Sequence, residues 1–348
     1  MSDKRAFPTG HGGQIDAMAT AFPDAPLPWI DLSTGINPFA YPLPPIPTEA
    51  WARLPTAADR ERCEAAMAAA FGCERAHCRA VPGTELVIRQ LPRILKVKRV
   101  ALRGRSYADH IESWRAAGAK VISVDDPLEH VGAVDAVVLV NPNNPDGKRW
   151  SLDRIEATRA KLASRGGWVI VDEAYADLDP ALSMAAMAGR EGLIILRSFG
   201  KFFGLAGIRL GAVLAAPSTL SDLADQLGEW DVSGPAQSLG ASAYADLEWQ
   251  NATRLKLRTA RDDLSKLLAS AGIEEVGGTD LFRFVRVRDA AALWEALASK
   301  GIAVRRFHSD DHHLRIGLPD TDGLCRLAEA LSLLSARGGQ LPPIPRVR

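Results

Sequence analysis

Short apolar runs alternate with longer amphipathic stretches through the first two thirds of the chain. Apolar runs bounded by glycine, proline or polar residues are typical of buried strands. Stretches with helical periodicity, such as 152–164, separate most of these runs. This alternation predicts the α/β class, with a mostly parallel sheet flanked by helices and right-handed crossovers. The predicted strands are 78–81, 100–102, 120–124, 134–140, 168–171, 193–196 and 211–215.

The pattern changes after Ala216, where helical stretches precede shorter strand-like runs. These predict a small α+β domain, with helices over 252–271, 290–299 and 323–336 and strands over 282–287, 302–304 and 314–316. The first 48 residues are rich in proline and glycine, which favours an extended arm over a core element. We therefore expect an arm at 1–48, a large domain at 49–235, a small domain at 236–337 and a loosely ordered tail at 338–348.

Composition narrows the class of partners. The 42 basic and 42 acidic residues cancel, so there is no electrostatic basis for binding nucleic acid or an anionic membrane. No run approaches the ~18 apolar residues that span a bilayer, and no apolar signal core follows the first residues. We therefore expect a cytoplasmic globular protein with no nucleic-acid or membrane partner.

The four cysteines are too few for a disulfide framework in a chain of this size. His77 lies between Cys73 and Cys78, which invites a zinc interpretation. No second pair of ligands follows at a suitable spacing, so we expect structural thiols and no metal.

The stretch 198–211 combines a reactive amine with groups that suit a phosphate. The amine of Lys201 can form a Schiff base with an aldehyde, and the side chains of Ser198 and Arg209 can bind a phosphate dianion. Pyridoxal phosphate carries both an aldehyde and a phosphate, so this stretch predicts it as the cofactor. A solvated lysine is the commoner alternative, but apolar, glycine-rich flanks favour close backbone approach.

Asp172 follows the apolar run 168–171, and Tyr175 lies three residues further on. Ligands of α/β enzymes bind at the carboxyl ends of parallel strands. A carboxylate there could pair with the protonated pyridine nitrogen, and the tyrosine could reach the ring hydroxyl. Asp172 could instead cap the following helix.

Two other predicted strands end in candidate cofactor residues. The run 134–140 leads into a rigid turn that contains Asn144, whose amide could also reach the ring hydroxyl. The run 78–81 leads into Gly83-Thr84-Glu85, a small-residue turn that opens a helix and exposes backbone N–H groups. Such a turn is an anion site, although Gly-Thr alone is weak evidence.

These motifs, in this order along nearly the whole chain, resemble the fold-type I pyridoxal-phosphate enzymes of the class I/II aminotransferase superfamily. The resemblance implies that Lys201 is the Schiff-base lysine and that Asp172 pairs with the pyridine nitrogen. It also implies a homodimer. The other implied contacts are Tyr107, Asn144 and Tyr175 to the ring, Gly83, Thr84, Ser198 and Arg209 to the phosphate with Glu85 in support, and Arg315 to the substrate carboxylate.

The N-terminal arm is similar to that of one family in this superfamily, the threonine-phosphate decarboxylases of cobalamin synthesis. The similar segments are His11-Gly12-Gly13 and 30–38, which contains Asn37. The resemblance implies a small phosphorylated amino acid, L-threonine O-3-phosphate, as substrate and (R)-1-aminopropan-2-yl phosphate as product. It assigns His11, Gly12 and Gly13 to the substrate phosphate and Asn37 to the carboxylate. A flexible terminus with a solvated His11 is the alternative.

Related enzymes place two arginines near the end of the chain, one for phosphate and one for carboxylate. This implies Arg305 and Arg315 as substrate residues, although Arg306 competes with Arg305. Bidentate guanidinium contacts suit both anionic groups. The adjacent His312 and His313 point apart on a strand, so we expect neither to bind a metal.

One position departs from the family pattern. Relatives commonly have a tyrosine before a proline, which reaches the neighbouring subunit's site, where this chain has Leu54-Pro55. The cross-subunit contact is therefore in doubt. Two rival functions stay open: an aminotransferase of the histidinol-phosphate type, which needs the same cofactor residues, and a non-catalytic protein that keeps the cofactor as a ligand or acts as an assembly partner.

Overall fold

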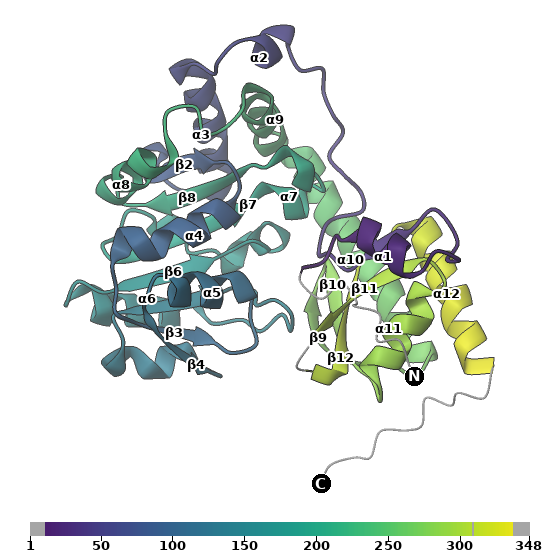
Figure 1. The fold of residues 1–348 in the computed structure, drawn as a ribbon. Coiled ribbons are helices and arrows are strands. Elements are labelled where there is room, and N and C mark those ends of the chain that lie inside the picture. The colour runs from purple at the N-terminus through teal and green to yellow at the C-terminus, as the bar shows by residue number, and fades with distance from the viewer. Residues whose placement is uncertain (1–10, 308–309, 337–348) are drawn as a thin grey trace. The chain divides into compact units, whose positions relative to one another are not determined.

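The computed structural model describes residues 11–307 and 310–336, so the predicted tail at 338–348 lies outside the described residues. The chain forms two compact units (Figure 1). Unit 2 comprises Ala40–Ala252, and unit 1 combines the described residues up to Phe39 with those from Thr253 onward. These divisions differ from the predicted boundaries at 48/49 and 235/236. One reason is that α9 (Gly234–Ala245) packs against α3 (Ala57–Phe71) of unit 2.

Unit 2 is built on a seven-stranded sheet in the order β2-β8-β7-β6-β5-β3-β4. Only β8 runs antiparallel to its neighbours, so the predicted mostly parallel sheet is confirmed. β5 and β8 are buried along their whole length, as expected for strands covered on both faces. The strands are β2 (Cys78–Val81), β3 (Arg99–Arg103), β4 (Lys120–Val124), β5 (Ala136–Val140), β6 (Trp168–Asp172), β7 (Leu193–Ser198) and β8 (Gly211–Ala215).

Helices of unit 2 bury their apolar faces against this sheet. α4 (Thr84–Leu95), α5 (Ala108–Ala116) and α8 (Pro217–Leu227) share one apolar core with it. α3 begins at a capping box, in which Thr56 and Asp59 each accept a hydrogen bond from the other's backbone N–H. The remaining helices are α2 (Thr48–Ala52), α6 (Leu152–Ala163) and the short α7 (Phe199–Phe202).

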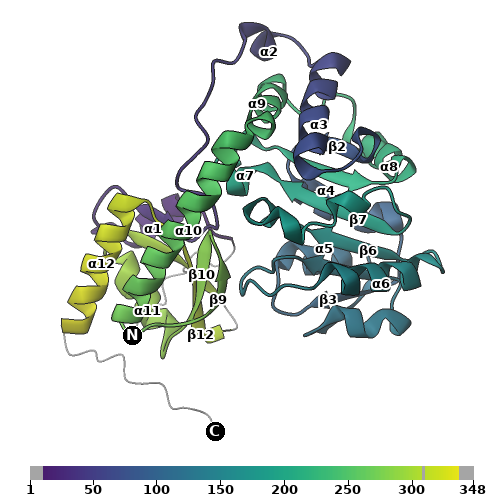
Figure 2. The ribbon, with the colours of Figure 1, turned by 180° about the vertical axis from the view of Figure 1, so that it is seen from behind.

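Unit 1 contains a five-stranded sheet in the order β1-β11-β12-β10-β9. β1 runs parallel to β11, and the other neighbours are antiparallel. Figure 2 shows the helices of this unit beside the sheet. The strands are β1 (Ile30–Leu32), β9 (Glu274–Thr279), β10 (Phe282–Arg286), β11 (Ile302–Phe307) and β12 (Asp310–Gly317), and the helices are α1 (Ile15–Ala21), α10 (Leu247–Ser270, which begins in unit 2), α11 (Ala290–Ala298) and α12 (Thr321–Ala336).

The expectation of an N-terminal arm without core elements was wrong. Residues Ile30, Asp31 and Leu32 pair with Ile302, Ala303 and Val304, and Leu32 is buried. A three-residue strand among prolines carries little local signal, and its partner strand stabilises it. None of the helices in the described ranges has the length and apolar character needed to cross a bilayer.

Candidate active site

Strand register brings the predicted phosphate residues to one edge of the unit 2 sheet. Gly211, the first residue of β8, lies beside Val81 in β2 and Ser198 in β7. Thr84 follows β2 directly, and a Cβ on Gly211 would lie 3.2 Å from its backbone nitrogen. The start of α4 and the end of β7 therefore meet at the start of β8.

Gly83 and Arg209 are in contact at the same edge. Gly83 has φ +82°, a region that favours glycine, and a Cβ there would lie 2.9 Å from Nη2 of Arg209. Arg209 itself has φ +54° and directs its guanidinium over the first turn of α4. The helix N-terminus and this guanidinium together suit a phosphate.

Two acidic residues, Glu85 and Asp109, lie near Arg209 and a second arginine, Arg89. Nη2 of Arg209 lies 3.8 Å from Oε2 of Glu85, while Nη2 of Arg89 lies 3.2 Å from Oε1 of Glu85. Arg89 also lies 3.8 Å from Asp109, a buried carboxylate. Arg89 was missed by the sequence analysis, although its i,i+4 spacing from Glu85 is a signal for an ion pair on a helix.

Asp172 ends β6 and is buried, with both carboxylate oxygens in use. Oδ2 lies 3.0 Å from Nε2 of His110, and Oδ1 accepts the Ala174 N–H at 3.1 Å. The second bond is similar to the helix-capping contact that was the alternative role for Asp172, because it joins the carboxylate to a backbone N–H two residues later. His110 was not predicted from the sequence; its position three residues after Tyr107 places it one turn along α5.

The other predicted ring contacts lie on the same unit. Oη of Tyr107 donates to Asp109 at 2.7 Å, and its ring meets His110 edge-to-face at 6.2 Å between centroids. Burial, and then the Asp109 carboxylate, raises the pKa of Tyr107. Tyr175 is buried and Asn144 is half-buried. The two other asparagines of this turn, Asn141 and Asn143, are buried.

Lys201 lies on α7 and is half-buried. The neighbouring side chain of Phe202 is fully buried, as is Phe199 at the start of the helix. The environment therefore differs from that of a solvated surface lysine.

A buried ionic cluster includes Glu173, the residue that follows Asp172, and it was not predicted from the sequence. Nη1 of Arg197 lies 3.1 Å from Glu173, and Nη2 pairs with Asp177; the three side chains are 9% exposed or less. Burial raises the pKa of Glu173 against the opposing effect of the guanidinium. Burial also disfavours the charge of Arg197, but the two carboxylates outweigh it and raise its pKa.

The cluster fixes the segment that carries Asp172 and Tyr175. Glu173 also accepts hydrogen bonds from the Ser183 hydroxyl at 2.5 Å and the Met184 N–H at 2.7 Å. The signal for it in the sequence was an arginine, Arg197, inside the otherwise apolar strand that precedes Ser198.

The predicted substrate residues lie in unit 1. Arg315 in β12 is 6% exposed, and its Nη2 donates to the carbonyl of Ser33 at 2.6 Å. Asn37 is also buried, and its Oδ1 accepts the Phe39 N–H at 2.7 Å. Arg305 and Arg315 are direct cross-strand partners, so their side chains leave the same face of the sheet.

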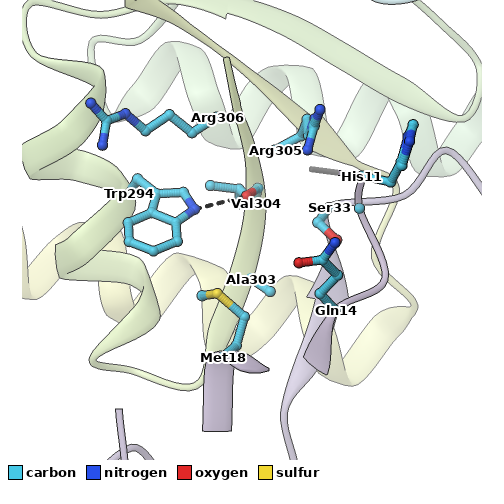
Figure 3. A pocket seen from close by; sticks show the side chains of 10 residues that line it. His11, Gln14, Met18, Ser33, Trp294, Ala303, Val304, Arg305 and Arg306 are labelled. Carbon is cyan, nitrogen blue, oxygen red and sulfur yellow. Dashed lines mark hydrogen bonds between the residues drawn. The ribbon is translucent and has the colours of Figure 1, made fainter. Parts of the chain in front are cut away.

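A hollow of about 320 Å³, part of it open to solvent, lies where β1 ends beside β11 (Figure 3). In Figure 3 Arg305 lies on the His11 side, whereas Arg306 extends above the Trp294 indole. The cationic side chains around it suit an anionic ligand. Its lining includes His11, Gly12, Ser33, Trp294, Arg305 and Arg306.

The glycines beside His11 pack against Ser33. A Cβ on Gly12 would lie 2.3 Å from the Ser33 carbonyl oxygen, and the Gly13 N–H donates to the Ser33 hydroxyl at 2.8 Å. Close approach therefore explains a glycine at position 12. The Gly13 N–H is engaged by Ser33, and the assignment of Gly13 to the substrate phosphate stays a prediction.

No group of three or more histidine, cysteine or acidic residues that could hold a metal occurs within 11–307 and 310–336. His312 contacts the carbonyl of Arg288 and His313 contacts Asp310, so the adjacent imidazoles have different partners. The four cysteines form no disulfide.

Comparisons with known proteins agree with this arrangement. The family model of aminotransferase class I and II matches residues 48–331. A threonine-phosphate decarboxylase from Pseudomonas aeruginosa is 41% identical over 92% of this chain and 96% of its own length. Another, from a Sinorhizobium species, is 42% identical over 93% and 98%.

Among solved structures, a histidinol-phosphate aminotransferase from Sinorhizobium meliloti in complex with pyridoxal 5'-phosphate has the same fold. The TM-score is 0.78 at 20% identity, and the match covers 92% of this chain and 95% of that one. At that identity the likeness concerns the fold alone.

Proposed function

The chain belongs to the aminotransferase class I and II family, and from this premise we propose that it decarboxylates L-threonine O-3-phosphate in cobalamin biosynthesis. The carboxylate carbon leaves as carbon dioxide, and a proton takes its place on Cα. The product is (R)-1-aminopropan-2-yl phosphate. The observation that carries the proposal is the likeness over more than nine tenths of the chain to two threonine-phosphate decarboxylases.

The residues at the sheet edge of unit 2 fit pyridoxal 5'-phosphate. Arg209 and the first turn of α4 offer a cation and backbone donors for its phosphate. Asp172, buried against His110, offers a carboxylate for a protonated ring nitrogen. When bound, this cofactor links covalently to an amine and accepts the electron pair released at Cα.

Within this scheme the chain supplies binding, orientation and proton transfer. With the cofactor bound, the Lys201 amine would hold its aldehyde between turnovers and would deliver the proton to Cα. Asp172, held in place by His110, would keep a proton on the ring nitrogen. Tyr107, Asn144 and Tyr175 would orient the ring.

The substrate's two anionic groups have separate partners in unit 1. We assign the carboxylate to the buried Arg315 and to Asn37. We assign the phosphate to the hollow of Figure 3, with His11 and Arg305 as its hydrogen-bond donors and Gly12 and Gly13 as its lining and support. Arg305 is preferred to Arg306 because it shares a sheet face with Arg315. Fixing both ends sets which bond at Cα breaks.

An aminotransferase of the histidinol-phosphate type is the second candidate. It would use the same lysine, aspartate and phosphate residues, and a solved structure of that type shares the fold. A histidinol-phosphate aminotransferase from Burkholderia mallei is 32% identical over 61% of this chain, against 41% and 42% over 92% and 93% for the two decarboxylases. Decarboxylation is therefore the better supported function.

The test is carbon dioxide release from L-threonine O-3-phosphate by the purified full chain, with added pyridoxal phosphate and no keto acid. We expect turnover that falls by at least ~10³-fold in Lys201→Ala, because one amine both holds the cofactor and transfers the proton. Turnover that depends strictly on added 2-oxoglutarate would instead support the aminotransferase.

We also propose a cytoplasmic homodimer. The large apolar side chains of unit 2 that are more than half exposed include Trp51 at 65%, Leu54 at 61% and Trp230 at 54%, and a second copy could cover them. Leu54 would then add apolar contact where relatives supply a tyrosine hydroxyl. Light scattering should give about twice the mass of one chain, and Trp51→Glu should lower it.

A further inference from the structure

A carboxylate lies where the cofactor phosphate is expected. Glu85 is the second residue of α4, and its Oε2 is 3.8 Å from Nη2 of Arg209. The same Nη2 lies against Gly83, the residue that begins this turn. A phosphate monoester carries about −1.5 to −2 charges at pH 7, so Glu85 both repels it and competes for Arg209.

Arg89 pairs with the other oxygen of this carboxylate. Its Nη2 and Nε lie 3.2 and 3.4 Å from Oε1 of Glu85. A second, longer contact of 3.8 Å joins Arg89 to the buried Asp109, which also accepts the Tyr107 hydroxyl. Arg89 is therefore placed between Glu85 and a fixed, buried carboxylate.

Folding stability does not account for this arrangement. The side chains of Glu85, Arg89 and Arg209 are 48%, 52% and 58% exposed. Ion pairs this exposed contribute little to stability. Their geometry matters more for the anion that Arg209 binds.

We propose that Arg89 is a positioning residue for the cofactor phosphate, which acts by holding and neutralising Glu85. When the phosphate binds, it takes the place of Glu85 at Arg209, while Glu85 stays with Arg89. Without Arg89, Glu85 has Arg209 as its remaining cation and opposes the phosphate. The inference rests on the cofactor site proposed above and does not depend on which reaction follows.

The test is the affinity of the cofactor-free full chain for pyridoxal phosphate, titrated at low salt and followed by cofactor absorbance. Arg89→Ala should weaken binding about 3- to 5-fold, the effect expected of an exposed ion pair. Glu85→Gln should bind at least as tightly as the unmodified chain. The double variant should return to within about 2-fold of Glu85→Gln.

Two controls separate this role from others. Arg93→Ala removes an exposed arginine from the last turn of the same helix and should leave the affinity unchanged. Pyridoxal, which lacks the phosphate, should bind Arg89→Ala and the unmodified chain equally. Equal thermal midpoints would show that the variants are folded.

Three outcomes would overturn the inference. Arg89→Ala could bind pyridoxal phosphate as well as Arg93→Ala does. It could weaken binding as much in the Glu85→Gln background, in which case Arg89 contacts the phosphate itself. Failure of the unmodified chain to bind pyridoxal phosphate would overturn the cofactor site as well, whereas absence of carbon dioxide release would overturn only the proposed reaction.

Discussion

The two units hold their functional side chains in different ways. In unit 2 the proposed cofactor residues follow strand ends, and buried side chains of the same unit fix them, as His110 fixes Asp172. In unit 1 the proposed substrate residues come from opposite ends of the chain. There, Arg315 binds the backbone carbonyl of Ser33, 282 positions away.

The difference separates the residues proposed for the chemical step from the residues proposed to select the substrate. The residues of unit 2 match what every member of the superfamily needs, an amine, a carboxylate and a phosphate site. The residues that we propose for the substrate in unit 1 would bind the two ends of one molecule. We therefore expect changes in unit 2 to lower stability or kcat, and changes in unit 1 to act mainly on KM.

The largest effect should follow from breaking the buried cluster of unit 2. Arg197→Met leaves Glu173 and Asp177 buried without their cation, which should lower the free energy of unfolding by about 3–5 kcal/mol. Urea denaturation measures it. The control is Arg286→Met in unit 1, whose pair with Glu274 is exposed and should contribute at most ~1 kcal/mol. Equal losses of unfolding free energy in the two variants would contradict this difference between the units.

The next effect concerns the cofactor ring. Asp172→Asn should lower kcat about 10²- to 10³-fold, the usual cost of removing a preorganised charge, with little change in KM. His110→Phe should lower kcat less, because the carboxylate keeps its bond to the Ala174 N–H. Steady-state kinetics on L-threonine O-3-phosphate decide this. A rise in KM with kcat unchanged would assign Asp172 to the substrate instead.

A smaller effect is expected from the substrate carboxylate in unit 1. Arg315→Gln removes a charged donor worth about 1.5–3 kcal/mol, so kcat/KM should fall about 10- to 150-fold. Most of the change should be in KM. Arg306→Gln is the matched control on the neighbouring strand, and its kinetics should stay within about 3-fold of the unmodified enzyme. Equal effects of the two variants would contradict the assignment.

The smallest effect should appear on acidification. Hydrogen bonds from Arg159, followed by Arg190, lower the pKa of Glu156 in unit 2. A lowered folded pKa gives stability that is present above the unfolded value of about 4.3 and is lost as pH falls through the folded value. Glu156→Gln should therefore cost about 0.5 kcal/mol at pH 7 and less near pH 3. Urea titrations at both pH values measure it, and an equal cost would contradict the sign.

Sequence patterns located the elements of unit 2 well. Strands 78–81, 120–124 and 211–215 match the observed bounds, because each is an apolar run between strong boundary signals. The same approach missed β1 and β9. β1 is three residues among prolines, and β9 consists of Glu-Glu-Val-Gly-Gly-Thr, which lacks apolar alternation. Both depend on partner strands.

For the site, residue type and strand ends predicted individual side chains but few of the contacts between them. The edge formed by Gly83, Thr84, Ser198 and Arg209 was expected from motifs, and strand register accounts for it. The contact of His110 with Asp172 joins residues 62 positions apart, and no local pattern encodes that distance. The hydrogen bond that occupies the Gly13 N–H was equally hidden, because Ser33 is 20 residues away.

The pairing of β1 with β11 also determines when unit 1 can be completed during synthesis. A ribosome adds roughly 5–20 residues per second, so Ser33 waits about 15–55 s before Arg315, 282 positions later, has been made. Unit 2 is complete at Ala252, before the last strands of unit 1 exist. In a newly made chain, the unit that we propose to bind the cofactor is therefore complete first, and the unit that we propose to bind the substrate is finished only when both ends of the chain are available.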